Sequence, residues 1–271
     1  GDNRNGQPGD KVVAKFVRWD PPARIPTCKV IRVLGPGDDP LTDHQGILAK
    51  FGLSGSFPSK VEEQANAIAQ SVDPKEIKKR MDFRDIFTLT IDPLDARDFD
   101  DALSVQKIND DEWEIGVHIA DVSYYVQLNS ALDKEARKRG NSTYLVGEVV
   151  PMLPQSLSNG ICSLVEGQDR LVKSVLFRFR NDGKMVSSKL AECVINSNKR
   201  LTYEQAILFL RGNRLESIKE AKPPSSRYSG NPGKPLQEVS SDELKQINLT
   251  IQRVWSIASK LRTEKMRAGS L

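Results

Sequence analysis

Aspartates crowd a short stretch of the sequence, residues 92–101, which reads Asp-Pro-Leu-Asp-Ala-Arg-Asp-Phe-Asp-Asp. Asp98 and Asp100 are two residues apart, so an extended backbone points both carboxylates to the same side. Asp92 ends one apolar run and Asp101 begins the next. Carboxylates this close repel each other unless a cation lies between them, and hard oxygen ligands suit Mg²⁺ or Mn²⁺. Two such ions can activate water and stabilise the leaving oxygen in phosphodiester cleavage. The alternative is a solvated acidic turn.

The charge of the chain is unevenly distributed around this stretch. The 271 residues contain 40 basic and 36 acidic side chains, a formal net charge of +4. Between Asp82 and Asp101, seven aspartates and two arginines give −5, so the remaining residues carry +9. This distribution is what we expect of a site that binds cations, surrounded by a surface that attracts a polyanion.

Other catalytic and metal-binding motifs fit poorly. An EF-hand loop fails because Leu94 or Ala102 occupies a position that needs an oxygen ligand, and no P-loop, GxSxG or HExxH motif occurs. The two histidines exclude a histidine-rich metal centre, and His118 lies in an apolar run that favours a structural role over a catalytic one. Three scattered cysteines without a CxxC pair argue against disulfides or zinc and indicate a reducing compartment. No apolar run approaches the length of a membrane span.

The elements that would position the aspartates are strands and helices without strict βαβ alternation. Short apolar, β-branched runs predict strands, in chain order over residues 10–19, 28–34, 83–91, 102–108, 112–126, 171–180 and 185–195. Asn181-Asp182-Gly183 predicts a hairpin between the last two. Helices are expected over about 60–69, over 131–139 with Gly140 at its end, from a capping box at Thr202, and from Asp242 with Ser241 as the cap. This mixture predicts an α+β or mixed α/β catalytic-type domain.

Several further blocks accompany the aspartates. Residues 82–103 contain the cluster itself, and related blocks follow in order at residues 116–126, 132–136, 144–147, 150–154 and 157–164. Together these blocks resemble the ribonuclease II / ribonuclease R family, and most closely its bacterial ribonuclease R branch. A single aspartate cluster is much less specific than this ordered series.

The resemblance implies a hydrolytic exoribonuclease that degrades single-stranded RNA processively from its 3′ end to nucleoside 5′-monophosphates, with two Mg²⁺ ions. The metal ligands would be Asp92, Asp98, Asp100 and Asp101, and Asp100 matches the aspartate most critical for cleavage. Tyr144 matches a tyrosine that stacks on the 3′-terminal base, a contact that tolerates any sequence. Without the resemblance, Tyr144 would be interpreted as a core tyrosine of a strand.

The resemblance also predicts how the chain is divided. Residues 1–35 would end a cold-shock, OB-like RNA-binding domain, and 36–79 would form a linker with a helical segment. Residues 80–271 would be the N-terminal part of a mixed α/β RNB-type catalytic domain, in which the proline-rich range 219–240 is a mobile insertion. The family's catalytic domain continues beyond Leu271 with a phosphate-binding arginine and a glutamate near the metals, so we expect a fragment.

Basic side chains around the hairpin at Asn181-Asp182-Gly183 fit an RNA path, although such charges also occur on ordinary solvated faces. These residues are Arg170, Lys173, Arg178 and Arg180. We expect a monomeric, cytoplasmic protein that binds RNA 3′ ends, with no membrane and no disulfide partner. A non-catalytic RNA-binding module and a different two-metal phosphodiesterase are the competing hypotheses.

Overall fold

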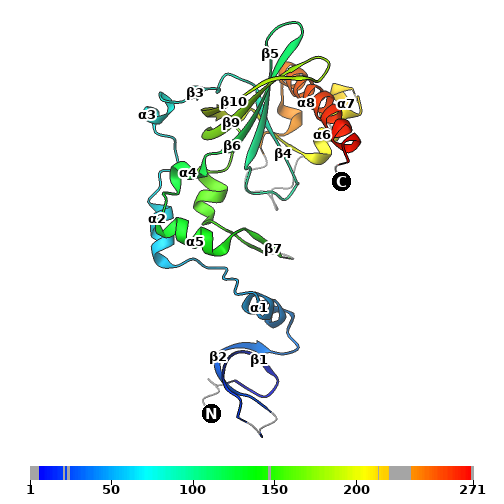
Figure 1. The fold of residues 1–271 in the computed structure, drawn as a ribbon. Helices are drawn as coiled ribbons and strands as arrows, with labels where there is room; N and C mark the ends of the chain where they lie inside the picture. The colour runs from blue at the N-terminus through cyan, green and yellow to red at the C-terminus, as the bar shows by residue number, and fades with distance from the viewer. Residues whose placement is uncertain are drawn as a thin grey trace. The chain divides into compact units, whose positions relative to one another are not determined.

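The computed structural model describes residues 6–20, 22, 25–145, 148–212, 214–219 and 233–269. These described residues divide into two compact units, and Figure 1 shows their elements in chain order. The first unit comes from residues 1–59 and 135–152, and the second from residues 60–134 and 153–271. Each unit is therefore made of two separate stretches of chain.

The first unit joins an antiparallel strand pair to a helix and a second short strand pair. Strands β1 (Asp10–Arg18) and β2 (Thr27–Pro36) precede helix α1 (Pro40–Lys50). Strands β7 (Thr143–Leu145) and β8 (Glu148–Val150) pair with each other. Arg139 connects the two stretches of this unit, because its guanidinium donates to the carbonyls of Ser54 and Ser56 and stacks on the Phe57 ring.

The described part of the second unit is built on one mixed sheet of seven strands. Their order across the sheet is β11-β4-β5-β6-β9-β10-β3. The pairs β11–β4 and β10–β3 are parallel, whereas the four pairs between them are antiparallel. The strands are β3 (Met81–Asp82), β4 (Thr88–Asp92), β5 (Asp101–Lys107), β6 (Glu112–Ala120), β9 (Asp169–Arg180), β10 (Met185–Asn196) and β11 (Lys199–Thr202).

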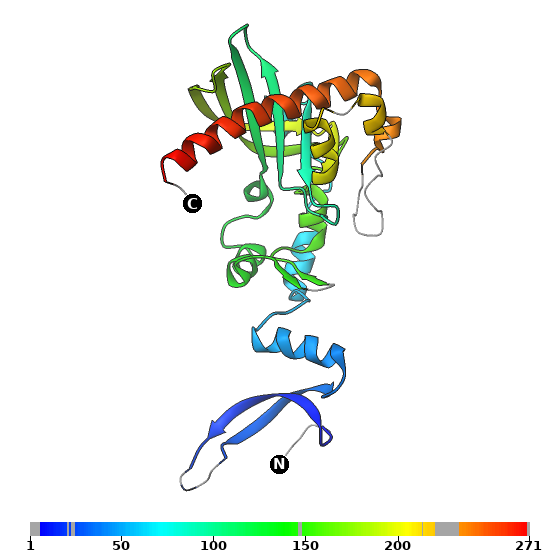
Figure 2. The ribbon, with the colours of Figure 1, turned by 90° about the vertical axis from the view of Figure 1, so that its right-hand side faces the viewer.

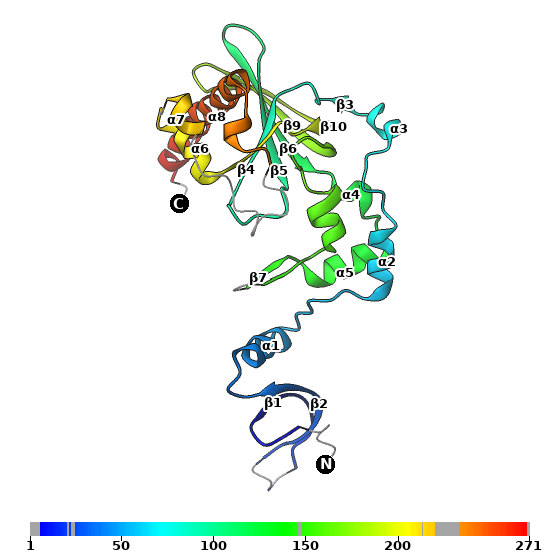
Figure 3. The ribbon, with the colours of Figure 1, turned by 180° about the vertical axis from the view of Figure 1, so that it is seen from behind.

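Helices cover one face of this sheet. The long helix α8 (Ser241–Arg267) runs across the strands in Figure 2, and Figure 3 shows α6 (Tyr203–Leu210) and α7 (Leu215–Lys219) beside it. Trp113, Ile115 and Phe179 of the sheet form a buried cluster with Ile257 of α8. The opposite face carries another core cluster that includes Phe99, in the loop between β4 and β5.

Four shorter helices connect these elements. They are α2 (Ser59–Asn66), α3 (Pro74–Ile77), α4 (Val122–Tyr125) and α5 (Ala131–Arg139). A single π-helical turn (Leu157–Ile161) and a 3₁₀ turn, η2 (Leu236–Glu238), complete the described helical segments. The π turn lies close in sequence to Ser163 and Leu164, which contact the aspartate loop.

Most predicted elements are confirmed, and the differences have local causes. The strand expected over 112–126 ends at Ala120, because the apolar residues that follow belong to the short helix α4. The strand expected over 83–91 is β4 alone, with a turn before Thr88. Ser240, rather than Ser241, caps α8, since Glu243 lies three residues after Ser240 and completes the capping box.

The compact units follow limits that differ from the predicted domains. Residues 36–59 belong to the first unit and 60–79 to the second, so the predicted linker is divided between them. Of the predicted mobile insertion 219–240, residues 220–232 lie outside the described residues. The end of that range is part of the core, because Leu236 and Val239 are almost fully buried against the helices.

Candidate active site

Asp92 is the most buried of the four motif aspartates. It is the last residue of β4 and pairs in parallel register with Thr202 of β11. The residue is 8% exposed, and its Oδ2 atom has no hydrogen-bond partner among the described residues. Removal from water raises the pKa of Asp92 to about 6, and the neighbouring charge of Asp101 adds to the increase. A buried carboxylate oxygen without a partner is a feature that a bound cation would explain.

Phe99 anchors the loop that carries Asp98 and Asp100. Its side chain is 1% exposed, while the aspartates on either side reach the surface. The Phe99 amide donates to Ser163 Oγ at 3.0 Å, and its carbonyl accepts from the Leu164 amide at 2.8 Å. This alternation of exposure is what an extended backbone with Asp98 and Asp100 on one side would give, and their common orientation stays a prediction.

Asp100 lies near two other carboxylates, those of Asp98 and Asp101. Partial burial raises its pKa, and the charges of Asp98 and Asp101 raise it further. Its carbonyl accepts a hydrogen bond of 2.9 Å from the amide of Ala120 at the end of β6. The backbone at this position is thus fixed by both β6 and the loop around Ser163.

The four carboxylates are neighbours without forming a compact ligand cluster. Among the described residues, no group of three or more His, Cys, Asp or Glu side chains is arranged to hold a metal ion. Like charges separate when no cation lies between them. The unpartnered Asp92 oxygen and the all-oxygen donor set fit Mg²⁺ or Mn²⁺. The predicted metal site stays a prediction.

Arg200 was not anticipated from the sequence. It is 1% exposed, and its Nη2 donates to the carbonyls of Pro93 and Leu94 at 2.8 and 3.3 Å. Its guanidinium carbon lies 5.2 Å from the centre of the Phe99 ring. Its sequence neighbours are mostly polar, so only the pairing of β11 with the strand that ends in Asp92 reveals this role.

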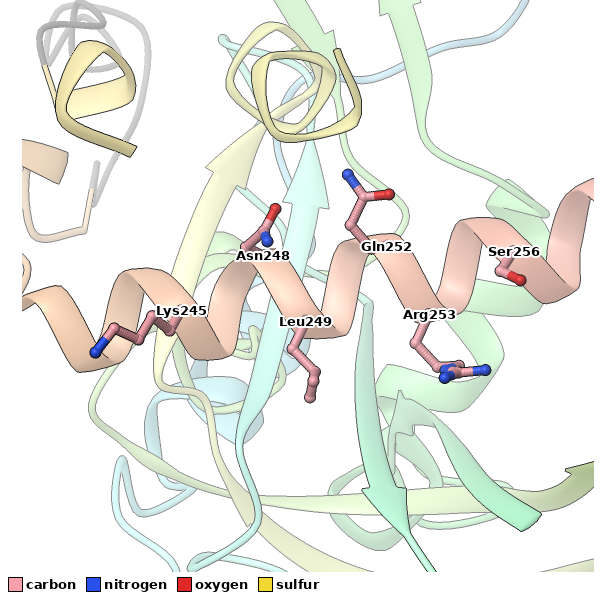
Figure 4. Close-up of a pocket in the computed structure, with 6 residues that line it drawn as sticks. All are labelled: Lys245, Asn248, Leu249, Gln252, Arg253 and Ser256. Carbon is pink, nitrogen blue, oxygen red and sulfur yellow. The ribbon is translucent and has the colours of Figure 1, made fainter. Parts of the chain in front are cut away.

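A cleft of about 280 Å³ borders the aspartate loop. Its lining includes Arg97 and Phe99 of the loop, together with Asn159, Gly160 and Gln168. A second, shallower depression lies along α8, where Figure 4 shows Lys245, Leu249 and Arg253 projecting from one side of the helix. No carboxylate lines either site, and the cleft is the better candidate for substrate because two residues of the aspartate loop, Arg97 and Phe99, form part of its wall.

Tyr144 and His118 occupy different settings. Tyr144 lies in β7 of the first unit and is 67% exposed, so the alternative of a core tyrosine is wrong. His118 lies in β6 and is completely buried, with Ser104 and Ser174 at 2.8 and 2.7 Å from its two ring nitrogens. The structural interpretation of His118 is confirmed.

Arg170 is a structural residue, which contradicts its predicted contact with RNA. It is 5% exposed, and its guanidinium donates to the carbonyls of Ser163, Asp169 and Gly160 and to the side chain of Gln168. These hydrogen bonds use four of the five N–H donors of the guanidinium, which leaves little for a phosphate even though Arg170 lines the cleft beside the aspartate loop. The guanidinium instead supports the loop that holds Phe99.

The other three predicted RNA-binding residues are exposed and paired with carboxylates. Lys173 Nζ lies 3.0 Å from Glu192, and Arg180 lies 2.8 Å from Asp182. Arg178 faces Glu114 across the β6–β9 pair at 3.6 Å. Their side chains are 42–52% exposed, so they can still reach a ligand at the surface, but the local charge is already partly neutralised.

Comparison with known proteins defines the class of this fold and site. The RNB domain family matches residues 80–271, and the cold shock domain family matches residues 1–58. The chain belongs to the RNB-domain family. This confirms the predicted mixed α/β RNB-type fold preceded by a cold-shock, OB-like segment.

Among characterised proteins, the chain is similar to ribonuclease R of Thermotoga maritima, with 47% identity over 80% of this chain and 31% of that protein. Its fold matches Mycoplasma genitalium RNase R in complexes with double-stranded RNA and with ribose-methylated single-stranded RNA. Both matches have a TM-score of 0.82 and 29% identity, and cover 99% of this chain and 43% or 38% of that one. Yeast Ssd1, a pseudonuclease, shares the fold alone, with a TM-score of 0.61 and 22% identity over 80% of this chain and 28% of that one.

The chain thus spans about a third of the length of the ribonuclease R that it matches. Within its described residues, no helix has the length and apolar character needed to cross a membrane.

Proposed function

We propose that this chain carries the metal-binding part of an exoribonuclease that hydrolyses RNA from its 3′ end. The observation that supports this most directly is the braced aspartate loop. Within the described chain, Asp92 keeps a buried oxygen without a partner, and Phe99, between Asp98 and Asp100, is buried and hydrogen-bonded to Ser163. The similarity to ribonuclease R proteins over most of the chain supports the same activity.

In this proposal Asp92, Asp98, Asp100 and Asp101 hold two Mg²⁺ ions, which Mn²⁺ can replace. The ions would supply activation of water and stabilisation of the leaving oxygen at the last phosphodiester. The protein fixes the ligands in place through Phe99, whose backbone bonds hold the loop before any substrate arrives. Preorganised ligands lower the cost of assembling the site.

The substrate we propose is the 3′ end of single-stranded RNA, degraded processively to nucleoside 5′-monophosphates in the cytoplasm by a monomer. Exposed Tyr144 would stack on the terminal base, and Lys173, Arg178 and Arg180 would contribute to the electrostatic attraction of RNA. The complexes of Mycoplasma genitalium RNase R with RNA support this substrate class.

The test uses the full-length protein and single-stranded RNA labelled at its 5′ end. We expect one-nucleotide shortening from the 3′ end with Mg²⁺ and none with chelator. Asp100→Asn should lower kcat by at least about 100-fold, because it removes one negative ligand from the reacting site. Asp95→Asn is the matched control, since it removes the same charge from an exposed position of the same loop.

Three outcomes would contradict the proposal. RNA binding without cleavage would establish the RNA-binding module instead. Equal cleavage of DNA and RNA would favour a different two-metal phosphodiesterase, because selectivity for RNA requires recognition of the 2′-hydroxyl. Equal losses in Asp95→Asn and Asp100→Asn would show that net charge, rather than a ligand, is responsible.

A further inference from the structure

Arg200 is a buried cation with few partners. Its Nε and Nη1 atoms have no hydrogen-bond partner within the part of the chain that the structure describes, and only Nη2 donates, to two successive carbonyls. Leaving a buried guanidinium under-bonded is costly, so such a residue in a folded protein requires an explanation. Its surroundings supply one.

Among the described residues, the hydrogen bonds and the ring contact of the Arg200 guanidinium are all with the segment that joins the motif aspartates. The carbonyls of Pro93 and Leu94 follow directly after Asp92, and the Phe99 ring lies between Asp98 and Asp100. The guanidinium therefore holds both ends of the loop. A planar guanidinium can stack on a ring while one nitrogen donates in its plane, which an ammonium cannot do.

Arg200 is itself fixed by Glu166. The Arg200 amide donates to Glu166 Oε2 at 2.9 Å, and the same oxygen accepts from Lys199 Nζ at 2.8 Å in a buried ion pair. Glu166 Oε1 accepts from the Lys234 amide at 3.0 Å. β11 also pairs in parallel with β4, with Arg200 opposite Thr90. The base of the Arg200 side chain is thus held on two sides.

We propose that Arg200 is a positioning residue that sets the separation of Asp92 from Asp98 and Asp100 and so makes the loop able to bind divalent cations. It touches neither substrate nor the reacting atoms. It contacts the Pro93–Leu94 backbone and the Phe99 ring, and its charge also attracts the nearby Asp92 carboxylate. This inference rests on the proposed function for its kinetic consequences, whereas its effect on cation binding can be measured separately.

The experiment compares full-length wild type with Arg200→Gln and Arg200→Lys. Mn²⁺ binding is measured without RNA by electron paramagnetic resonance, and Mg²⁺-dependent cleavage is measured in parallel. For Arg200→Gln we expect Mn²⁺ affinity to fall by about 10- to 100-fold, as when groups that orient metal ligands are lost. We expect kcat to fall by about 100-fold with KM for RNA changed by less than about 3-fold, because ligands are displaced while RNA contacts remain.

Arg200→Lys keeps the buried charge and guards against a variant that fails to fold. We expect it to recover part of the Mn²⁺ affinity, and amide hydrogen exchange at residues 94–98 to be faster than in wild type while β5 and β6 stay protected. Arg80→Gln is the matched control. Arg80 is similarly buried in the same unit, but it pairs with Glu76 and Asp121, outside the aspartate loop. The Arg80→Gln variant should have a lower free energy of unfolding than wild type and the same Mn²⁺ affinity.

Unchanged Mn²⁺ affinity and kcat in folded Arg200→Gln would overturn the inference, and so would equal losses of Mn²⁺ affinity in Arg80→Gln. Wild type that binds Mn²⁺ but does not cleave RNA would overturn the proposed function and leave the role of Arg200 decided by the binding data. If the wild-type protein neither binds Mn²⁺ nor cleaves RNA, the proposed function and the role of Arg200 are both overturned.

Discussion

Asp92 shows that the candidate site is arranged at the expense of stability. Its carboxylate is buried, its Oδ2 has no partner in the described chain, and its pKa is raised to about 6. Because the folded state binds this proton more tightly than the unfolded state, the ionised carboxylate destabilises the fold above pH 6. The penalty disappears as the pH falls from 6 towards 3.8.

Asp92→Asn should therefore stabilise the metal-free protein. At pH 7 with chelator we expect an increase of roughly 1–3 kcal/mol in the free energy of unfolding, since the neutral amide removes a buried charge. At pH 4 the difference from wild type should be close to zero. Chemical denaturation at both pH values measures it, and a destabilised Asp92→Asn at pH 7 would contradict the burial argument.

At this scale the sequence was informative about charges and uninformative about their burial. The spacing of Asp98 and Asp100 around an apolar Phe99 predicts their common orientation. In contrast, Arg170 and Arg200 look like surface residues in the sequence, because both stand among other polar and charged residues. Their burial results from strand neighbours that are distant in the chain, so the RNA contact of Arg170 was predicted wrongly.

At the scale of elements, the centre of the sheet contains a buried histidine that contacts two buried serines. His118 of β6 lies between Ser104 of β5 and Ser174 of β9, and its ring packs edge-on against Phe83. Burial lowers the pKa of His118 to about 4. The unfolded chain therefore binds a proton between pH 6.5 and 4 that the folded chain does not.

His118 should thus reduce stability as the pH falls from 6.5 to 4, by about 3 kcal/mol over that interval. His118→Gln lacks the titrating ring, so its unfolding free energy relative to wild type should improve by a similar amount on acidification. Denaturant midpoints at pH 7 and pH 4 measure the difference. A pH-independent difference between the two proteins would show that the ring does not remain neutral in the fold.

Gly116 makes the histidine arrangement sterically feasible. A Cβ atom at this position would lie 2.4 Å from Ser104 Oγ and 2.6 Å from His118 Nε2. Gly116→Ala should cost about 1–3 kcal/mol, because an overpacked core must shift to accept the methyl group. Thermal unfolding measures the loss. Gly140→Ala is an informative comparison, since no atom lies within 4 Å of its Cβ and only its backbone conformation is strained.

Element boundaries were predictable where local chemistry is decisive. The Thr202 capping box and the Asn181-Asp182-Gly183 hairpin are determined by neighbouring residues, and both are confirmed. The end of β6 was not predictable, because Val122 to Val126 has strand-like residue types but forms a helical turn. The pairing of β4 with β11, more than 100 residues later, leaves no local pattern in the sequence.

At the scale of the whole molecule, the positive charge outside the aspartate stretch is spread over partly neutralised pairs. Lys173, Arg178 and Arg180 each have a carboxylate partner within 3.6 Å. We therefore expect them to attract RNA collectively rather than to make three complete phosphate contacts.

Salt dependence of RNA binding distinguishes these cases. For the triple alanine variant of the full-length protein, the slope of log affinity against log salt should change by less than 1. Three direct contacts to single-stranded RNA would change it by about 2. Fluorescence anisotropy with chelator present measures the slope without cleavage. A change near 2 would establish Lys173, Arg178 and Arg180 as direct contacts.

The division of each compact unit into two stretches of chain has a consequence for biosynthesis. The carbonyls of Ser54 and Ser56 emerge from the ribosome long before Arg139, the residue that binds them. Likewise β4, with Asp92, must wait for β11 before its parallel neighbour exists. Neither unit is formed from one continuous stretch of the nascent chain, and the aspartate loop, held earlier by Ala120 and Ser163, stays incompletely braced until Arg200 has been synthesised.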